Sequence, residues 1–172
     1  MKLRTTTIAA AALGTFLLSG CSGPSSLTGG SGTICASSSE YEHLVGSVRL
    51  ENDGESEITL DSVSFGELDN IEVRDVWAAP DAERADNWAR RGVAAPESRD
   101  DEYWADAVEV SGASVPPGGS NAVFFSITRT DGDQDGTVTD VIIEYREGTG
   151  FTSRAGQLTA EVAYGFGEDC GS

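Results

Sequence analysis

Histidine and methionine, on which many enzymes and metal sites depend, are almost absent from this chain. Among 172 residues, His43 is the single histidine and Met1 the single methionine. A Ser-His-Asp triad would have to use His43, and a copper site built from methionine and histidine lacks its ligands. The sequence also lacks HExxH, CxxC, phosphate-loop and dinucleotide-binding glycine patterns. Carboxylates are too abundant to single out a glycosidase-like pair, so we expect a non-catalytic protein.

Lysine is missing after Lys2, so arginine supplies nearly all of the positive charge. Acidic residues outnumber basic ones by 29 to 11, which gives a formal net charge of −18. Such a surface repels nucleic acid and anionic lipid headgroups and argues against nucleic acid as a partner, whereas divalent cations and basic partners become more credible. The same composition is typical of GC-rich or salt-tolerant organisms, so the charge could reflect habitat instead of function.

The first 21 residues have the order of a bacterial export signal. Basic residues within positions 1–4 precede an apolar run over 8–17, which is too short to span a membrane. The next four residues, LSGC at 18–21, resemble the lipobox of bacterial lipoproteins. That resemblance implies cleavage before Cys21, a diacylglycerol on its sulfur, and a lipid anchor on the extracytoplasmic face of the cell membrane. The alternative is an ordinary signal peptide in which the cysteine occurs by chance.

Three segments are expected from this organisation. Residues 1–20 form the signal peptide, and their removal takes away Lys2 and Arg4, so the net charge becomes about −20. Residues 21–33 contain the lipidated cysteine and a small, polar stretch with no hydrophobic period, which predicts a flexible tether. Residues 34–172 are long enough for one domain with a normal core.

The two remaining cysteines lie near the two ends of this domain. An extracytoplasmic compartment is oxidising, so Cys35 and Cys170 are expected to form a disulfide. Closing so long a loop would stabilise the fold by about 4 to 5 kcal/mol in the chain-entropy description. The bridge also predicts that the first and last strands are neighbours. A reactive thiol or a cysteine-based metal site is the alternative.

Alternating apolar residues predict a series of short β-strands. Ile58 and Leu60 share one parity. Val63 and Phe65 take the opposite parity, which predicts a β-bulge between the two pairs. Turn residues separate the strands, above all PPGG at 116–119. The apolar positions expected to face the core are Leu44, Val48, Leu50, Ile58, Leu60, Ile71, Val73, Trp77, Val123, Phe125, Ile127, Val141, Ile143, Tyr145, Leu158, Ala160, Val162 and Tyr164.

About seven short strands punctuated by glycine and proline predict an all-β, antiparallel sandwich. The proline-glycine turn and the closing hairpin resemble immunoglobulin-like domains of bacterial secreted proteins over roughly residues 40–170, without the antibody spacing of cysteine and tryptophan. The order of a VxLxNxG-like start at 48–54, VPPGGS at 115–120 and EYREGTGF at 144–151 resembles uncharacterised actinobacterial lipoproteins. That family implies no activity.

An acidic loop at 131–136 is the sharpest local motif. Asp131, Asp133 and Asp135 alternate and are followed by glycine, as at the start of a calcium loop. An EF-hand needs a glutamate at its twelfth position, which Ile142 occupies, so that form is excluded. A calcium site of another kind stays open. The alternative is an acidic hairpin turn, in which Asp-Gly pairs are favoured for backbone reasons.

A long connection near the middle of the chain interrupts the strands. Residues 80–92 begin with proline and end with glycine, which predicts a short helical insertion. Long connections are often functional, so we expect a patch here that binds a protein or a glycan. Alternatively, Trp77 packs in the core and Trp88 pins the helix to the sandwich. The residues expected to form the patch are Trp88, Arg90, Arg91, Tyr103 and Trp104.

Together these patterns predict a lipid-anchored surface module that binds an envelope protein or a cell-wall polymer through residues 78–106. No catalytic residue, nucleic-acid partner or cofactor other than calcium is expected. The first alternative is a calcium-stabilised surface domain that uses the Asp131–Asp135 loop, and the second is an enzyme of unrecognised type.

Overall fold

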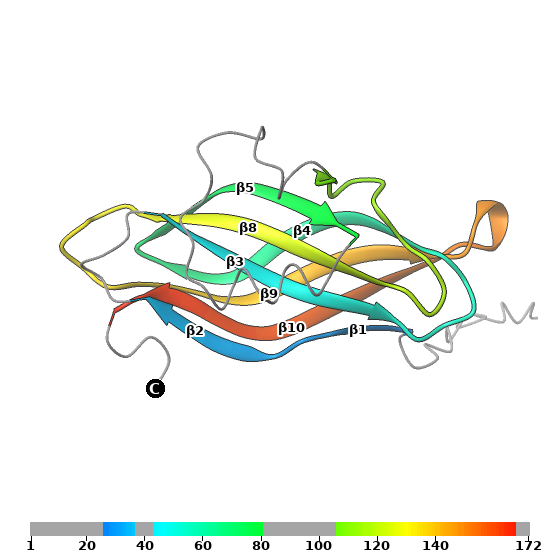
Figure 1. The fold of residues 1–172 in the computed structure, drawn as a ribbon, viewed down its shortest axis with the longest axis horizontal. Coiled ribbons are helices and arrows are strands. Elements are labelled where there is room, and N and C mark those ends of the chain that lie inside the picture. Colours follow the sequence, from blue (N-terminus) through cyan, green and yellow to red (C-terminus); the bar gives the residue numbers. More distant parts are fainter. Residues whose placement is uncertain (1–25, 37–42, 81–105, 168–172) are drawn as a thin grey trace, which may run out of the picture.

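The structure is a computed structural model that describes residues 26–36, 43–80 and 106–167 (Figure 1). Most of these residues lie in strands, and their helical content is one 3-10 turn, Gly150–Thr152. The strands are β1 (Leu27–Gly29), β2 (Gly32–Ala36), β3 (His43–Asn52), β4 (Ile58–Asp69), β5 (Ile71–Ala79), β6 (Val108–Glu109), β7 (Ser114–Val115), β8 (Ser120–Arg129), β9 (Gly136–Glu147) and β10 (Arg154–Phe166).

The strands form two five-stranded sheets that pack face to face. Sheet A has the order β1-β3-β8-β5-β6, and sheet B has the order β2-β10-β9-β4-β7. Neighbours are antiparallel, except that β2 runs parallel to β10. The order β1-β3-β8-β5 matches the ABED sheet of an immunoglobulin domain, and β4, β9 and β10 match its CFG sheet. The prediction of an all-β, immunoglobulin-like sandwich is therefore confirmed, with β2, β6 and β7 added at the sheet edges.

The core lies between the sheets and centres on Phe125 of β8. Its ring meets Phe65 edge-on at 5.0 Å between centroids and Tyr164 at 5.1 Å. Gly46 pairs with Phe125 across β3 and β8, and a Cβ on Gly46 would lie 2.3 Å from the ring, so this position requires glycine. Apart from Trp77, every apolar position expected to face the core lies in it or packs against it.

The predicted bulge in β4 is confirmed. The register of β4 against β9 shifts between Leu60 and Ser62. The extra residue changes the parity of the strand, so Leu60 before it and Val63 after it both face the core.

A single residue, Asn70, connects the two sheets between β4 and β5. Its φ is 51°, in the left-handed region that asparagine tolerates better than most residues. This backbone conformation allows the chain to leave sheet B at Asp69 and enter sheet A at Ile71.

The predicted tether is wrong for residues 27–33, which belong to the folded domain. Leu27 is 1% exposed, lies in the core and pairs with Asn52. A Cβ on Gly29 would lie 2.9 Å from Leu158 Cδ2, so glycine at this one position lets β1 lie close to that side chain. Gly30 and Gly32 have open space where a Cβ would lie.

The predicted neighbourhood of the first and last strands is confirmed for β2 and β10. Cys35 lies on β2 at the register position of Gly165 on β10. Cys170 follows four residues after the end of β10 and lies outside the described residues, so the disulfide stays a prediction.

Two other expectations concern parts of the chain that the structure does not describe. The predicted helical insertion at 80–92 falls almost entirely within 81–105, and the signal and lipidation site fall within 1–25. Within the described ranges no helix is long and apolar enough to cross a membrane.

Candidate functional site

Part of the outer face of sheet A, which points away from the core, carries a cluster of apolar side chains. Phe124, near the centre of β8, is 4% exposed and has Trp77 of β5 as its cross-strand partner. Because β8 buries Phe124 on one face and Phe125 on the other, it is apolar on both sides. We call this set of side chains the outer cluster: Val45, Ala79, Ala122 and Phe124, with Trp77 and Ala107 packed against them.

The outer face of sheet B is polar, and Arg146 forms an ion pair with Asp61 on it. Arg146 Nε lies 2.9 and 3.0 Å from the two carboxylate oxygens of Asp61, and Arg146 Nη2 lies 2.7 Å from Asp61 Oδ1. The hydrogen bond to Asp61, followed by its charge, raises the pKa of Arg146 above its ordinary value. Ser62 Oγ donates to Glu144 Oε2 at 2.8 Å. Exposed pairs of this kind are typical of a solvated surface and add little stability.

The long connection begins and ends beside the outer cluster. It leaves sheet A after Ala79, a member of that cluster, and Ala107 packs against the cluster where the described chain resumes. β6 then pairs with Trp77 and Ala78 at the edge of sheet A. Trp77 is half-buried in the outer cluster, so the alternative that placed it in the main core is wrong. The five residues of the predicted patch, Trp88, Arg90, Arg91, Tyr103 and Trp104, lie outside the described residues.

The acidic loop between β8 and β9 closes around the side chain of Asn70. Asn70 Nδ2 lies 2.9 to 3.1 Å from three carbonyl oxygens of the loop, those of Asp131, Gln134 and Asp135. Asn70 Oδ1 accepts hydrogen bonds from Thr130 Oγ1 at 2.6 Å and from the Asp131 amide at 2.8 Å. The amide group therefore occupies the centre toward which the loop carbonyls point.

One of the predicted calcium ligands, Asp131, has hydrogen-bonding partners for its carboxylate within the loop itself. Asp131 Oδ1 accepts from the Asp133 amide at 3.0 Å, and Asp131 Oδ2 accepts from Gln134 Nε2 at 2.6 Å. Asp133 and Asp135 are exposed. In the part of the chain that the structure describes, no group of three or more His, Cys, Asp or Glu could hold a metal. These contacts fit the acidic-turn interpretation, and calcium binding stays a prediction without support from the geometry.

His43 has a structural partner at the start of β3. Its Nδ1 lies 2.7 Å from Thr128 Oγ1, on the residue that faces it across the β3–β8 ladder. The ring is half-buried. This contact is a cross-strand polar pair of the kind that stabilises sheets.

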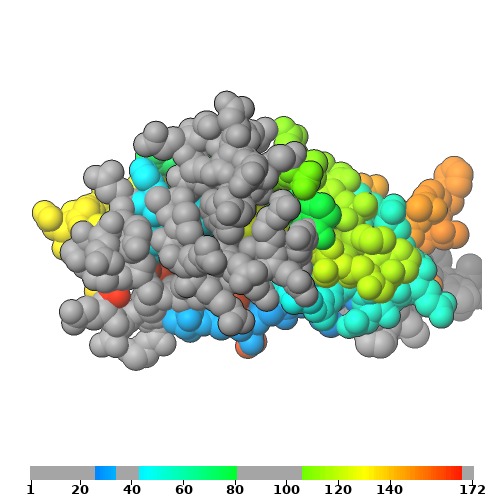
Figure 2. Space-filling model, in the orientation of Figure 1, coloured from blue at the N-terminus to red at the C-terminus, as the bar shows by residue number. Residues whose placement is uncertain are grey.

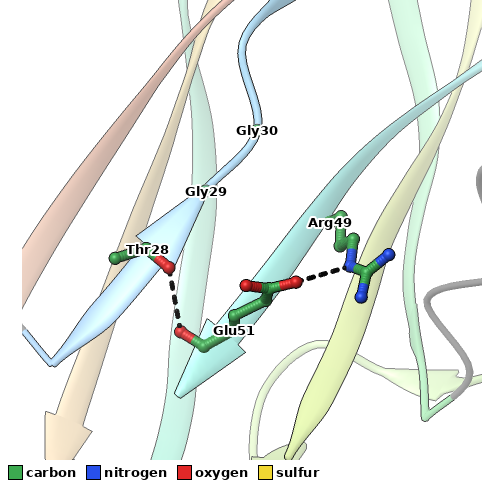
Figure 3. Close-up of a pocket in the computed structure, with 5 residues that line it drawn as sticks. All are labelled: Thr28, Gly29, Gly30, Arg49 and Glu51. Carbon is green, nitrogen blue, oxygen red and sulfur yellow. Dashed lines mark hydrogen bonds and ion pairs between the residues drawn. The ribbon is translucent and has the colours of Figure 1, made fainter. Parts of the chain in front are cut away.

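A small polar pocket lies at the edge of sheet A between β1 and β3 (Figure 3). It has a volume of about 180 Å³ and is lined by Thr28, Gly29, Gly30, Arg49 and Glu51. Arg49 Nε lies 2.9 Å from Glu51 Oε1, and Thr28 Oγ1 donates to the Glu51 carbonyl at 3.4 Å. Ligand pockets are ordinarily about 300 to 1,000 Å³ and mostly apolar, so this pocket does not fit a small-molecule substrate.

The β9–β10 hairpin presents the most exposed large apolar side chain among the described residues. Phe151 is 111% exposed and lies on the 3-10 turn at the tip. Gly148 and Gly150, with φ of 83° and 61°, provide the left-handed conformations of the turn. Residues 148–153 contain no charged side chain.

The hairpin shares one end of the sandwich with the start of the described chain. The Gly148 amide donates to the Glu57 carbonyl at 2.8 Å, and the Asp53 amide donates to the Ser26 carbonyl at 2.9 Å. We call this the hairpin end, and we call the opposite end, with Asn70 and the acidic loop, the far end (Figure 1).

Sequence analysis did not identify the roles of three residues: Phe151, Asn52 and Asn70. Phe151 was seen only as part of the closing hairpin. Asn52 was noted only within the VxLxNxG-like stretch at 48–54, yet its Nδ2 donates to the carbonyls of Ser56 and Val115 at 2.8 and 2.9 Å. Asn70 had a usable signal, because it lies between two apolar patterns and asparagine tolerates a positive φ.

No family model matches the chain, and no curated protein matches it. Among solved structures, the VesB protease of Vibrio cholerae is similar with a TM-score of 0.42 and 8% identity, over 81% of this chain and 31% of VesB. The PapD-like domain 7 of human CEP192 is similar with a TM-score of 0.40 and 8% identity, over 97% of this chain and all of that domain. The secreted serine protease VesC from Vibrio cholerae has a TM-score of 0.33 and 14% identity, over 78% of this chain and 21% of VesC.

The chain thus spans about a third of VesB and about a fifth of VesC. Because all three similarities are weak in both identity and TM-score, they assign neither an activity nor a partner. The class of the fold, an immunoglobulin-like sandwich, rests on the strand order of the two sheets.

Proposed function

We propose that this chain is a non-catalytic binding module, held by a lipid on Cys21 at the extracytoplasmic face of the cell membrane. It binds an envelope protein or a cell-wall polymer on the side of sheet A, through the connection at 78–106. The observation that carries the proposal is the outer cluster: sheet A carries this apolar cluster on its outer face, whereas the outward side chains described above for sheet B are polar.

The position of the connection supports this choice of side. The described residues that flank the connection, Ala79 and Ala107, both belong to the outer cluster, so the connection starts and ends at this cluster. Tryptophan, tyrosine and arginine are the residue types most often found as binding anchors, and the connection contains all three. A loop fixed at both ends on a rigid sheet is a common position for a binding site.

The charge of the chain narrows the chemistry of the partner. With a net charge of −18 over the full sequence, the surface disfavours polyanions by simple repulsion. A neutral glycan that stacks on aromatic rings, or a protein with a basic surface, fits this electrostatic condition.

Sedimentation with purified peptidoglycan sacculi tests the proposal for a polymer, and chemical crosslinking in intact cells tests it for a protein. The test variant is Trp88→Ala with Trp104→Ala. The matched control is Thr59→Ala with Thr159→Ala, which removes two side chains from β4 and β10 of sheet B.

Loss of sedimentation or of a specific crosslink in the tryptophan variant, with an unchanged melting temperature and an unaffected control, would support the proposal. Binding that survives in the tryptophan variant, or that is lost equally in the control, would contradict it. A tryptophan variant that loses stability without losing binding would show that these residues pack and do not bind.

A further inference from the structure

The chain between the lipid anchor and the folded domain is short. The described structure begins at Ser26 and its first strand at Leu27, so residues 22–25 separate Cys21 from the domain. A fully extended chain reaches about 3.6 Å per residue, so Cys21 and Ser26 are at most about 18 Å apart. β10 has 13 residues and spans about 43 Å at about 3.3 Å per residue. The segment 22–25, which we call the short tether, therefore reaches less than half the length of the sandwich.

The short tether joins the domain at the hairpin end. Ser26 accepts a hydrogen bond from the Asp53 amide, and Leu27 pairs with Asn52, the last residue of β3. A lipid on Cys21 therefore holds the hairpin end within about 18 Å of the bilayer. An inverted domain, with its far end on the bilayer, would place the hairpin end one sandwich length from the membrane. The reach of residues 22–25, about 18 Å, is too short for that orientation.

The tip of the hairpin has the chemistry of a membrane contact. Phe151 is fully exposed on a turn whose six residues, 148–153, are uncharged in an otherwise strongly acidic chain. At the base of the tip, Glu147 and Arg154 are cross-strand partners of opposite charge. Figures 1 and 2 show the hairpin, in orange, projecting from the end of the sandwich at which the β3–β4 loop also lies.

Exposed carboxylates lie at both ends of the sandwich. Asp131, Asp133 and Asp135 are exposed at the far end, and Asp53, Glu55 and Glu57 are exposed at the hairpin end. Anionic headgroups repel both sets, so the orientation depends on the short tether and on the uncharged hairpin tip and not on charge.

We propose that the hairpin tip, with Phe151 at its centre, inserts into the headgroup region of the bilayer in which Cys21 is anchored. The domain then stands on its hairpin end and directs the far end away from the membrane. An aromatic side chain adds a second, protein-borne contact to the lipid anchor, and two points of contact fix an orientation that a single lipidated residue does not. This inference rests on the proposed lipid anchor.

Fluorescence quenching of the full, lipidated chain in vesicles tests the inference. The vesicles contain phosphatidylethanolamine and phosphatidylglycerol, with or without brominated acyl chains that quench tryptophan. The reporter is Phe151→Trp, and the matched control is Gly132→Trp in the loop at the far end. A Cβ at Gly132 would meet no atom within 4 Å, and the Phe151 side chain is fully exposed, so neither substitution starts in a packed position. The native tryptophans give a common background that is subtracted with the parent chain.

We expect the added emission of Phe151→Trp to fall about twofold in brominated vesicles and to shift to shorter wavelength, as for an indole at the headgroup region. The added emission of Gly132→Trp stays unchanged. A chain that floats with the vesicles but shows no quenching at position 151 overturns this inference alone. Quenching at both positions overturns the orientation. A chain that does not float with the vesicles overturns the lipid anchor, and with it both proposals.

Discussion

The two ends of the sandwich are each held together by an asparagine side chain, but water has different access to them. At the hairpin end, Asn52 is 1% exposed and ties the β3–β4 loop to β7 through Ser56 and Val115. At the far end, Asn70 is half-buried and ties the β4–β5 corner to the acidic loop. The same side chain satisfies loop carbonyls at both ends. The loss in the free energy of unfolding when either side chain is removed therefore depends on whether water can replace its hydrogen bonds.

The largest effect is expected from Asn52→Ala. Its removal leaves the Val115 carbonyl, inside the fold, without this donor, and the Gly54 amide loses its 2.9 Å bond to Asn52 Oδ1. We expect the free energy of unfolding to fall by about 3 kcal/mol, because buried polar groups would lose their partners. Urea unfolding followed by circular dichroism measures it. A loss below that of Asn70→Ala would contradict the comparison.

A smaller loss is expected from Asn70→Ala. Water can solvate the exposed loop carbonyls, but alanine disfavours a φ of 51°. We expect a loss of about 2 kcal/mol, of which roughly half comes from the backbone. The control is Asn70→Gly, which accepts the same φ and should lose only about 1 kcal/mol. Equal losses in the two variants would show that backbone strain plays no part.

The response of the melting temperature to calcium tests whether the loop at the far end binds this ion. Because the Asn70 amide already lies against the three loop carbonyls, we expect the melting temperature in millimolar calcium to equal that in EDTA. Ligand binding to the folded state raises stability by RT ln(1 + [L]/Kd), so even a weak site would be visible. A rise that magnesium does not reproduce, and that Asp131→Asn abolishes, would restore the calcium site.

Among the substitutions, the smallest effect on stability is expected from Phe151→Ser at the hairpin end. The side chain is fully exposed and has no core to leave, so the free energy of unfolding in solution should change by less than about 0.5 kcal/mol. Differential scanning calorimetry of the chain without membranes checks this. A larger loss would mean that Phe151 packs against the rest of the protein in solution and is not free to contact a membrane.

The strand pattern was predictable because it depends on local parity. The opposite parities of Ile58–Leu60 and Val63–Phe65 revealed the bulge in β4, and the alternation in β8 revealed its core face. Parity could not show that Phe124, on the other face of β8, is also buried, because that depends on what packs there in three dimensions.

The start of the domain was mispredicted because glycine and serine have two uses. In the stretch before Cys35 they suggested a flexible linker, but Gly29 is small so that β1 can lie against Leu158. Composition alone cannot separate flexibility from close packing. The candidate site was predictable only in part: the pattern located the long connection, whereas the outer cluster that supports it required the pairing of Trp77 with Phe124.

The most direct measurement is the intact mass of the chain extracted from the membranes of cells that express it with its signal. Cleavage before Cys21 and lipidation predict the mass of residues 21–172 plus a diacylglycerol, with or without a further acyl group on the amine. The variant Cys21→Ser should be missing from the membrane fraction. A chain in the soluble fraction, or one whose Cys21 carries no lipid, would contradict the anchor and with it the membrane-bound binding module.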